Sequence, residues 1–484
     1  HGGVRYLQQG NISLVMDALR ERGLLLRLAA HVARPLPFIV PLYGGTRRPL
    51  GITLPPIARP LVPLGVRAGL LAYDMFARSR ELRHWVLSRD RLEREAPDLR
   101  TDGLRRAFVY YDAKTDDVRL THSVLATARI HGATTLNYAA AATLCSDGTQ
   151  VIGALVADRL TGRSFEMPAR FVVNATGIWA EELASLDGPP PFRIRHSKGV
   201  HAVLRPGAVR TSMAIVIPET DDGRLAFIVP WADRLILGTT DEHYEGDLEH
   251  PVATAAEVAY LLDHANRYLT RPLRRQDVTG TYAGIRPLVA AAAGETAALS
   301  RDHYLATSAG GLISITGGKL TTYRKMAEDT VDAIVARDGG ARPCRTESIP
   351  LAGSMGLEQT RTALEAAALS PDQRAHLLDA YGSAAEAILA LIRGDAALAN
   401  RLADGLPVVA AEVVYACQAE QAVTLADCLY LRTRLAVLDA DAGDRAAGRV
   451  ADLMTRELGW DKDERQKQLA LYEALRAKET LDAH

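Results

Sequence analysis

Two short segments of this sequence place glycines where a backbone could approach a ligand closely. Asn174–Gly177 ends an apolar run, and a glycine there has no Cβ to hold a flat ligand away. Gly317–Lys325 follows a second apolar run and opens a helix, whose free amides and dipole suit an anionic or electron-rich group. Taken alone, the first segment is more often an ordinary turn. In the second, a lysine at a helix N-terminus opposes the dipole, which favours a functional role.

Charged side chains and one histidine supply further candidates. Arg286 and Arg301 could bind a phosphate or carboxylate through two hydrogen bonds each, although spacing alone does not single them out among fifty arginines. His201 lies in a β-like run; a lone histidine is usually structural, yet one facing a pocket can act as a base. Asp241 follows an apolar strand, and we expect it to cap a turn.

Helical and extended segments must position these residues. Residues 11–30 read as an amphipathic helix, and eight prolines between Pro35 and Pro63 forbid a long helix there. We then expect helices over Val66–Phe76 and Arg119–His131, and strands over Thr134–Tyr138, Val151–Asp158 and Phe171–Gly177.

The later part of the chain predicts first short strands and then helices. Short β runs between residues 193 and 245 are separated by the turn signals Asp222-Gly223 and Ala232-Asp233, which is typical of an antiparallel sheet. Leu312–Ile315 is a further strand, followed by a helix to about Ala336. Residues 357–480 are rich in alanine, leucine, arginine and glutamate, which predicts a separate helical domain.

Composition excludes several classes of protein. The chain has 484 residues, of which 48% are hydrophobic and 24% charged, as in ordinary globular proteins of several domains. Its 57 basic and 58 acidic side chains nearly cancel, so bulk charge gives no case for a nucleic-acid partner. Four scattered cysteines suit a reducing compartment and predict neither a metal site nor a disulfide framework. No long uninterrupted apolar run predicts a membrane-spanning helix.

The motifs, taken in order, resemble those of FAD-dependent glycerol-3-phosphate dehydrogenases. His1–Leu7 is similar to the family's HGGLRYL, Asn174–Trp179 to NATGPW and Gly317–Lys325 to GGKLTTYRK. Trp231 with Gly238–Asp241 matches PW…GTTD. The remaining matches are Gly284–Leu288 to GVRPL, Ser300–His303 to SRDH, and, more loosely, Leu431–Arg434 and Gly459-Trp460.

The resemblance implies an α/β (α+β) fold with a glutathione-reductase-type FAD-binding domain, an antiparallel-sheet substrate domain and a C-terminal all-helical domain. The FAD-binding domain would comprise residues 1–34, 107–185 and 301–340. The substrate domain would comprise 35–106 and 186–300, and the helical domain 345–484.

The resemblance also implies oxidation of sn-glycerol 3-phosphate to dihydroxyacetone phosphate, with electrons passed to a membrane quinone. Arg286 and Arg301 would hold the substrate phosphate, with Arg5, Tyr6 and Lys319 lining the same pocket. His1 and His201 are both candidates for taking the proton of the C2 hydroxyl, and Lys319 would stabilise the anionic reduced flavin. The residues expected to contact FAD are Gly2, Gly3, Ala175, Thr176, Gly177, Gly317, Gly318, Lys319, Leu320 and Thr321.

One feature of the family is missing from the sequence. No GxGxxG dinucleotide fingerprint is present, so we expect that the chain lacks the family's first βαβ unit and binds FAD poorly or not at all. Two alternatives to a quinone-linked enzyme therefore stay open. One is a glycerophosphate oxidase that uses oxygen, although no extra insertion is evident; the other is an inactive fragment that associates through its helical domain.

Membrane contact rests on a proline-rich stretch. Arg34, Arg47, Arg48 and Arg59 lie in or beside it among apolar residues, which is compatible with binding to anionic lipid and equally with an ordinary packed loop. The quinone implied by the resemblance favours the membrane. We therefore expect a cytoplasmic enzyme peripheral to the inner face of the plasma membrane, and a homodimer remains an option.

Overall fold

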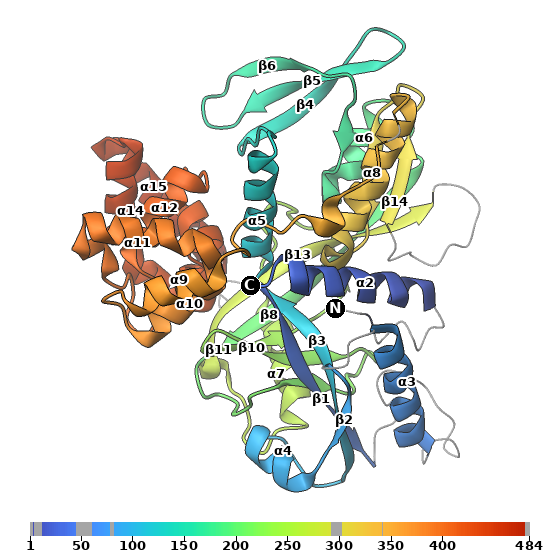
Figure 1. Cartoon of the computed structure of the whole chain (residues 1–484), viewed down its shortest axis with the longest axis vertical. Coiled ribbons are helices and arrows are strands. Elements are labelled where there is room, and N and C mark those ends of the chain that lie inside the picture. Colours follow the sequence, from blue (N-terminus) through green and yellow to red (C-terminus); the bar gives the residue numbers. More distant parts are fainter. Residues whose placement is uncertain are drawn as a thin grey trace.

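A computed structural model describes residues 3, 12–44, 61–77, 82–291, 303–340 and 342–479. A large twisted sheet occupies the lower part of Figure 1, two small sheets lie above it, and a helical domain packs at the side.

The large sheet has nine strands among the described residues. Its order is β12-β8-β11-β10-β9-β1-β3-β2, with β13 also paired to β8. Neighbours are antiparallel except β1 and β9, which confirms the antiparallel sheet expected from the sequence. The strands are β1 (Ala33–Tyr43), β2 (Trp85–Leu87), β3 (Leu104–Thr115), β8 (Phe192–Leu204), β9 (Ala214–Ile217), β10 (Ala226–Trp231), β11 (Arg234–Gly238), β12 (Glu242–His243) and β13 (Val278–Ala291).

Side-chain alternation gives this sheet two separate cores. On β1, Ile39 faces the core formed with α4 (Arg89–Glu95) and α7 (Ala255–Asn266), whereas Phe38 and Val40 face the core formed with α2 (Ile12–Leu28) and α3 (Val62–Ala77). The proline-rich segment is therefore a strand in its first part. Its prolines lie outside the two residues, Phe38 and Ile39, that pair with β9.

Two smaller sheets differ from the predicted elements. β14 (His303–Thr307), β15 (Ile313–Gly317) and β7 (Val173–Asn174) form one; β4 (Ala139–Ser146), β5 (Val151–Asp158) and β6 (Ser164–Pro168) form the other. The strand predicted over Phe171–Gly177 is thus only two residues long, and Val173 is 38% exposed rather than buried. The expected domain boundary at residue 107 falls inside β3, which pairs along its length with β1.

The strand predicted over Thr134–Tyr138 is wrong. These residues form no ladder because their polar groups bond to the helical domain instead. Asn137 donates to the Gln421 carbonyl over 2.7 Å, and the Tyr138 hydroxyl donates to Asp427 over 2.9 Å. Tyr138 also has a positive φ of 55°, which interrupts an extended strand.

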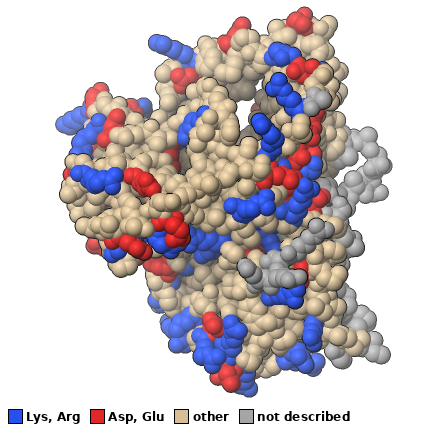
Figure 2. Space-filling view, viewed as in Figure 1, with Lys and Arg blue, Asp and Glu red and all other residues tan. Residues whose placement is uncertain are grey.

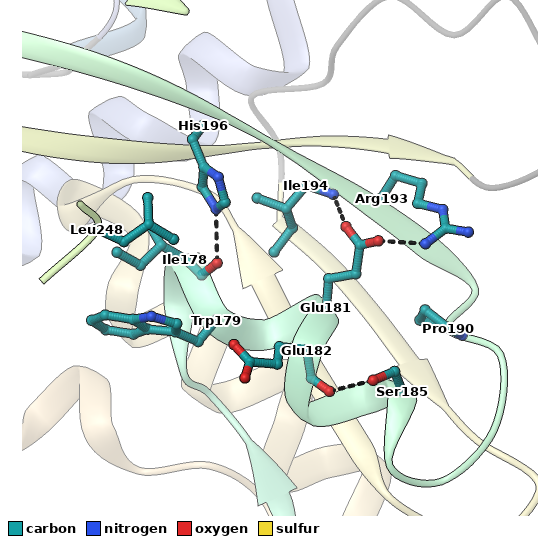
Figure 3. A pocket seen from close by; sticks show the side chains of 10 residues that line it. All are labelled: Ile178, Trp179, Glu181, Glu182, Ser185, Pro190, Arg193, Ile194, His196 and Leu248. Atoms are coloured by element: carbon teal, nitrogen blue, oxygen red, sulfur yellow. Dashed lines mark hydrogen bonds and ion pairs between the residues drawn. The ribbon is translucent and has the colours of Figure 1, made fainter. Parts of the chain in front are cut away.

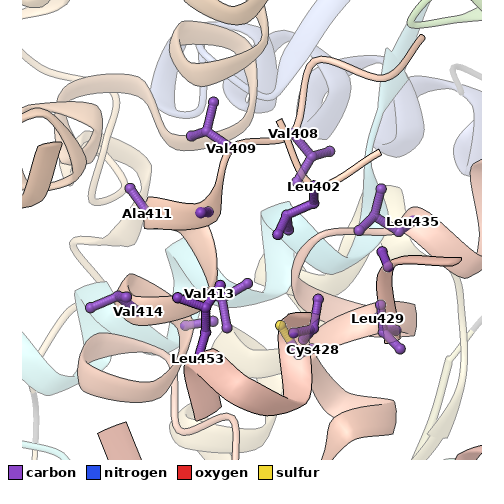
Figure 4. Packing of buried hydrophobic residues seen from close by; sticks show 14 of the residues in the cluster. Leu402, Val408, Val409, Ala411, Val413, Val414, Cys428, Leu429, Leu435 and Leu453 are labelled. Carbon is purple, nitrogen blue, oxygen red and sulfur yellow. The ribbon is translucent and has the colours of Figure 1, made fainter. Parts of the chain in front are cut away.

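The C-terminal part is helical, as predicted, and has its own core. Leucine, valine and alanine side chains pack at its centre (Figure 4), among them Val408, Val413, Leu429 and Leu453. The helices are α9 (Leu357–Glu365), α10 (Pro371–Tyr381), α11 (Ala385–Gly394), α12 (Ala410–Ala419), the π-helical η9 (Asp427–Arg432), α13 (Leu435–Leu438), α14 (Ala440–Leu458) and α15 (Lys462–Glu479).

One stretch of this domain is long and apolar enough to span a membrane by composition. Pro371–Gly394 reaches a mean hydropathy of 1.2 within the described residues. It consists of α10 and α11 with the turn at Gly382 between them, and its Leu377, Tyr381 and Ile388 lie in the helical core. Packing therefore accounts for its apolar residues.

The helical domain is anchored to both other parts of the chain. Arg119, on α5 (Asp117–Ile130), forms a buried two-bond pair with Glu420, at 2.6 and 3.0 Å. Arg234 of β11 pairs with Asp439 at 2.9 Å. These contacts hold the helical domain against α5 and the large sheet, side by side with them in Figure 1.

Candidate functional site

His201 lies in a row of three residues on adjacent strands. The register pairs it with Gly238 of β11 on one side and Tyr282 of β13 on the other. The His201 and Tyr282 rings stack with centroids 4.7 Å apart and planes 10° from parallel. A Cβ at Gly238 would lie 2.2 Å from the His201 ring, so only glycine leaves room for this imidazole.

The environment of His201 keeps its imidazole neutral. Burial, reinforced by the charge of Arg286, lowers its pKa to about 4. At neutral pH both ring nitrogens therefore share one proton, and one of them can accept another. A lowered pKa makes the imidazole a weak base in the free protein, so its role as proton acceptor stays a prediction.

Arg286 is held by three groups at the end of β11. Its guanidinium donates to the Thr239 hydroxyl at 3.1 Å and the Thr240 carbonyl at 3.3 Å, and lies 3.4 Å from an Asp241 carboxylate oxygen. The side chain is still 35% exposed, so it keeps donor capacity for a ligand. Such fixed donors suit a phosphate or a carboxylate.

Asp241 is an ion-pairing residue, not the turn cap expected from the sequence. Its carboxylate accepts from the Ser197 hydroxyl and faces both Arg286 and Arg224. Ser197 and Arg286 stand opposite each other in the β8–β13 register, so three strands fix this acid and its arginine.

Gly199 gives Arg286 its place above the sheet. An added Cβ would lie 2.3 Å from Arg286 Nη2, whereas one on the neighbouring Gly284 would meet nothing within 4 Å. We expect Gly199→Ala to displace the guanidinium of Arg286, because the flexible end of a side chain moves more easily than the sheet. The KM should rise about 10-fold, which corresponds to the loss of one charge-assisted hydrogen bond to the substrate. Steady-state kinetics measures the change.

Gly284→Ala is the matched control, since Gly284 pairs with Gly199 in the same ladder and should leave KM unchanged. Equal effects of the two substitutions would show that the ladder, and not the position of Arg286, sets KM.

The predicted cofactor segments form two glycine turns. Gly177 has a φ of 61°, and a Cβ there would project into open space. Gly317 and Gly318 have φ values of 73° and 71°, conformations that favour glycine. The following η5 (Leu320–Thr322) and α8 (Tyr323–Arg337) begin without a side-chain cap. These residues fit a flat, anionic group such as a flavin, because bare backbone and helix amides face it.

Side-chain contacts hold both turns in place. The side-chain amide of buried Asn174 donates through Nδ2 to the Ser314 hydroxyl of β15 at 3.2 Å. Its side-chain oxygen Oδ1 accepts from the backbone amide and the hydroxyl of Thr176, at 3.3 and 2.7 Å. Arg324, inside the second motif, forms a buried two-bond pair with Glu21 of α2, at 2.6 and 2.9 Å. Arg324 is therefore a structural anchor.

The structure brings the two groups of predicted residues together. β13, which carries Arg286, contacts both β15 and η3 (Gly177–Trp179), so one strand joins Arg286 to the elements that hold the glycine turns. Ala175, Lys319, Leu320 and Thr321 lie in the same turns, with Leu320 44% exposed and Thr321 buried. Gly3 is buried with a φ of 78°.

Five predicted residues cannot be placed. His1, Gly2, Arg5, Tyr6 and Arg301 lie outside the described residues, so their roles stay predictions.

A hollow of about 330 Å³ lies beside the first turn (Figure 3). The His196 ring there bonds the Ile178 carbonyl at 3.0 Å, and Glu181 pairs with Arg193. Trp179 lines the same hollow, but none of the predicted site residues does.

Sequence reasoning missed Tyr282, Thr239 and Ser197. The period of two along β8 was the available signal for Ser197, because it places 197, 199 and 201 on one face. Tyr282 required the β8–β13 register, which no local pattern gives.

Comparison with known proteins finds family matches over two ranges of the chain. Residues 1–324 match the family described as FAD dependent oxidoreductase, and residues 344–465 match the C-terminal domain of alpha-glycerophosphate oxidase. Glycerol-3-phosphate dehydrogenase 2 of Mycobacterium tuberculosis is 36% identical over 98% of this chain and 80% of its own length. The human mitochondrial glycerol-3-phosphate dehydrogenase is 35% identical over 97% of this chain and 66% of its own length.

A solved structure agrees with these relatives. The glycerol-3-phosphate dehydrogenase of Bacillus halodurans, complexed with FAD, superposes with a TM-score of 0.78 and 26% identity, over 95% of this chain and 84% of that one. The motifs, the glycine turns and these relatives agree: the chain belongs to the family of FAD-dependent glycerol-3-phosphate dehydrogenases.

Proposed function

We propose that this protein oxidises sn-glycerol 3-phosphate to dihydroxyacetone phosphate and passes the electrons to a quinone. The observation that supports the substrate most directly is Arg286, held by the end of β11 beside a neutral histidine. A phosphate dianion needs fixed guanidinium donors, and an alcohol that loses a hydride needs a base for its proton. The names of the relatives point to the same substrate.

Each residue has a role that follows from its chemistry. Arg286, with Arg301, Arg5 and Tyr6, holds the substrate, and His201 takes the proton of the C2 hydroxyl; His1 is the alternative base. FAD, when bound, supplies the two-electron acceptor for the hydride of C2. Gly177, Gly317 and Gly318 give it bare backbone, and the cation of Lys319 favours its anionic reduced form.

Substrate charge tunes the proposed base. In the free protein, burial and then Arg286 lower the pKa of His201. A phosphate dianion on Arg286 offsets that positive charge, so the pKa of His201 rises when substrate binds. The imidazole thus becomes a stronger base when the alcohol is in place.

An absorption spectrum tests the function. The missing GxGxxG predicts weak FAD binding, but the match of residues 1–324 to the FAD dependent oxidoreductase family favours retention. We therefore expect the purified chain, mixed with FAD and desalted, to keep a visible flavin band that bleaches on adding glycerol 3-phosphate and persists with glycerol or inorganic phosphate. Only the phosphorylated alcohol offers both the anion for Arg286 and the hydride. A bound flavin that glycerol 3-phosphate leaves oxidised would contradict the proposed substrate.

The acceptor is tested separately. We expect reoxidation by a soluble quinone to be fast and oxygen consumption to be slow. Rapid oxygen consumption without quinone would assign the chain to the alternative, a glycerophosphate oxidase. A chain that keeps no flavin yet associates through residues 357–480 would fit the inactive-fragment alternative.

The outer face of α3 supports contact with a membrane, the source of quinone. Leu64, Leu71 and Met75 are 67%, 51% and 73% exposed, whereas Leu70 and Tyr73 on the inner face are buried. Such an amphipathic helix suits the boundary of a lipid bilayer. Arg34, compatible by sequence with lipid contact or with an ordinary packed loop, pairs with Asp379 of α10 at 2.5 Å. Elsewhere, Figure 2 shows acidic and basic side chains interspersed.

Flotation with liposomes tests this surface. Leu64→Asp with Met75→Asp is expected to reduce the bound fraction at least about 10-fold, because each substitution replaces apolar burial with a charge. Leu471→Asp is the matched control, since Leu471 is 54% exposed on α15 of the helical domain. Equal flotation of all three proteins would remove α3 from the interface. The cytoplasmic location and a homodimer stay predictions.

A further inference from the structure

The helical domain reaches the row that contains His201. Its Leu431–Arg434 segment ends in Arg434, whose backbone has a φ of 62°. The guanidinium lies over the Trp231 ring at 5.4 Å, and 3.6 and 3.5 Å from the carboxylates of Asp116 and Asp117. Its side chain is 15% exposed, so this cation is largely enclosed by two acids and an indole.

Tyr282 packs on the ring of His201. Its ring face covers the imidazole at 4.7 Å. Its hydroxyl is within the field of the same charges: burial and then Asp117 raise the pKa of Tyr282, and Arg434 opposes them. The printed contact of the phenol is thus its stacking on the imidazole, while the charges of Asp117 and Arg434 act on its hydroxyl from a distance.

The adjoining backbone is packed just as closely. A Cβ at Gly280, two residues before Tyr282, would lie 2.4 Å from the Val437 carbonyl, and the Thr279 hydroxyl donates to the Leu438 carbonyl at 3.0 Å. The strand that carries Tyr282 is thus held by the segment that follows Arg434.

Gly238 and Tyr282 together fix the orientation of the imidazole. Gly238 leaves room at the ring edge, and Tyr282 covers the ring face. Within the described residues, no hydrogen bond of His201 Nδ1 to the protein is present. Aromatic contact, rather than a hydrogen bond to that nitrogen, therefore holds the ring.

We propose that Tyr282 is a positioning residue for His201, and that the helical domain, packed on β13 at Thr279 and Gly280, holds the strand that carries Tyr282. The helical domain then contributes to the reaction without touching the substrate. This inference rests on the proposed function only for its kinetic consequence, because the orientation of His201 can be measured without turnover.

Kinetics of variants form the first test. Tyr282→Leu removes the ring and is expected to lower kcat about 10- to 100-fold with little change in KM, because Arg286 still binds the phosphate while the base is misplaced. Tyr282→Phe keeps the stacking ring and should restore most of that loss. Thr279→Val removes the bond to the Leu438 carbonyl and should lower kcat in the wild type but add little to Tyr282→Leu, since both act through the position of the same ring.

Two controls separate positioning from stability. Arg234→Met breaks the Arg234–Asp439 pair, another buried arginine contact between the helical domain and the sheet. Tyr43→Leu removes the ring that packs on Tyr268 at 5.3 Å, in the same sheet and away from His201. Both should lower stability and leave kcat unchanged.

Nitrogen-15 NMR of the His201 imidazole gives the readout that needs no flavin. In the wild type the ring should titrate near pH 4, and in Tyr282→Leu its midpoint should move upward as water reaches the ring. Tyr282→Phe and Arg234→Met should keep the wild-type midpoint.

A wild-type midpoint and kcat in Tyr282→Leu would overturn the proposal, and so would fully additive effects of Tyr282→Leu and Thr279→Val. If the wild type does not oxidise glycerol 3-phosphate, the proposed function fails, and the NMR midpoints alone decide whether Tyr282 positions His201.

Discussion

Replacing Arg286 with methionine is expected to raise the KM for glycerol 3-phosphate about 100-fold or more. Charge-assisted hydrogen bonds contribute about 1.5–3 kcal/mol each, and the loss of two corresponds to that factor. Arg286 is pre-oriented by Thr239, Thr240 and Asp241, so little conformational entropy is lost when phosphate binds. The effect on kcat should be smaller, because a bound phosphate is present in both ground and transition states.

Arg224 offers a matched control for this substitution. Its side chain is 35% exposed, like that of Arg286, and it faces the same Asp241 from the other side. Arg224→Met should therefore reproduce the electrostatic effect on Asp241 without removing a phosphate ligand. A KM for Arg286→Met within threefold of that for Arg224→Met would remove Arg286 from the substrate site.

Arg286→Lys distinguishes the contribution of the charge from that of the planar guanidinium geometry. Lysine keeps the charge but cannot reach Thr239, Thr240 and a phosphate with one planar group, so its KM should lie between those of wild type and methionine. Activity equal to wild type would mean that charge alone, without the planar geometry, binds the substrate.

Much of the site could be predicted because its residues lie in short, contiguous motifs. Gly317–Thr321 is one turn, and its glycines have the positive φ that such a turn requires. Arg286 could be proposed from the motif it occupies and His201 as a histidine in a β-like run, but their proximity could not be predicted. That depends on β8 and β13 being neighbours, although 85 residues separate the two side chains.

The residues that support the site could not be predicted in the same way. Tyr282 belongs to an apolar strand whose pattern is satisfied by packing alone, so nothing local marks it as the partner of His201. Val437 and Leu438, which pack on its strand, come from another domain. Their roles follow from tertiary contacts, which local propensity does not encode.

The same reason explains the errors in secondary structure. Thr134–Tyr138 has the composition of a strand, but its polar groups bond Gln421, Thr424 and Asp427 of the helical domain. Hydrogen bonds to the helical domain take the place of hydrogen bonds to a neighbouring strand. The helical domain itself was predictable, since helical periodicity is a local property that a separate core preserves.

Glu420→Gln is expected to loosen the helical domain by about 3–5 kcal/mol, because it leaves the buried cation of Arg119 without its charged partner. Arg119 and Glu420 are 7% and 6% exposed and joined by two hydrogen bonds. The guanidinium also lies 4.0 Å from the centre of the Tyr381 ring, so it cannot turn into solvent without losing packing.

Amide hydrogen exchange is the suitable measurement, since a chain of several domains does not unfold in one step. Exchange at α5 and α12 should accelerate about 100-fold or more, as that free energy requires. Glu358→Gln is the control: Glu358 pairs with Arg361 on the surface of the helical domain, where the side chains are 84% and 53% exposed, and an exposed pair contributes about 0–1 kcal/mol.

Acid should reproduce the effect of Glu420→Gln in the wild type. Burial alone would raise the pKa of Glu420, but Arg119 outweighs it and holds the pKa below its ordinary value of 4.5. The pair's stabilisation is therefore complete above the unfolded-state pKa and is lost as pH falls through the lowered one. Exchange at α5 should accelerate in the wild type as pH falls below the ordinary glutamate pKa of 4.5, and should depend less on acid in Glu420→Gln. If both proteins respond to acid alike, other carboxylates hold the helical domain in place.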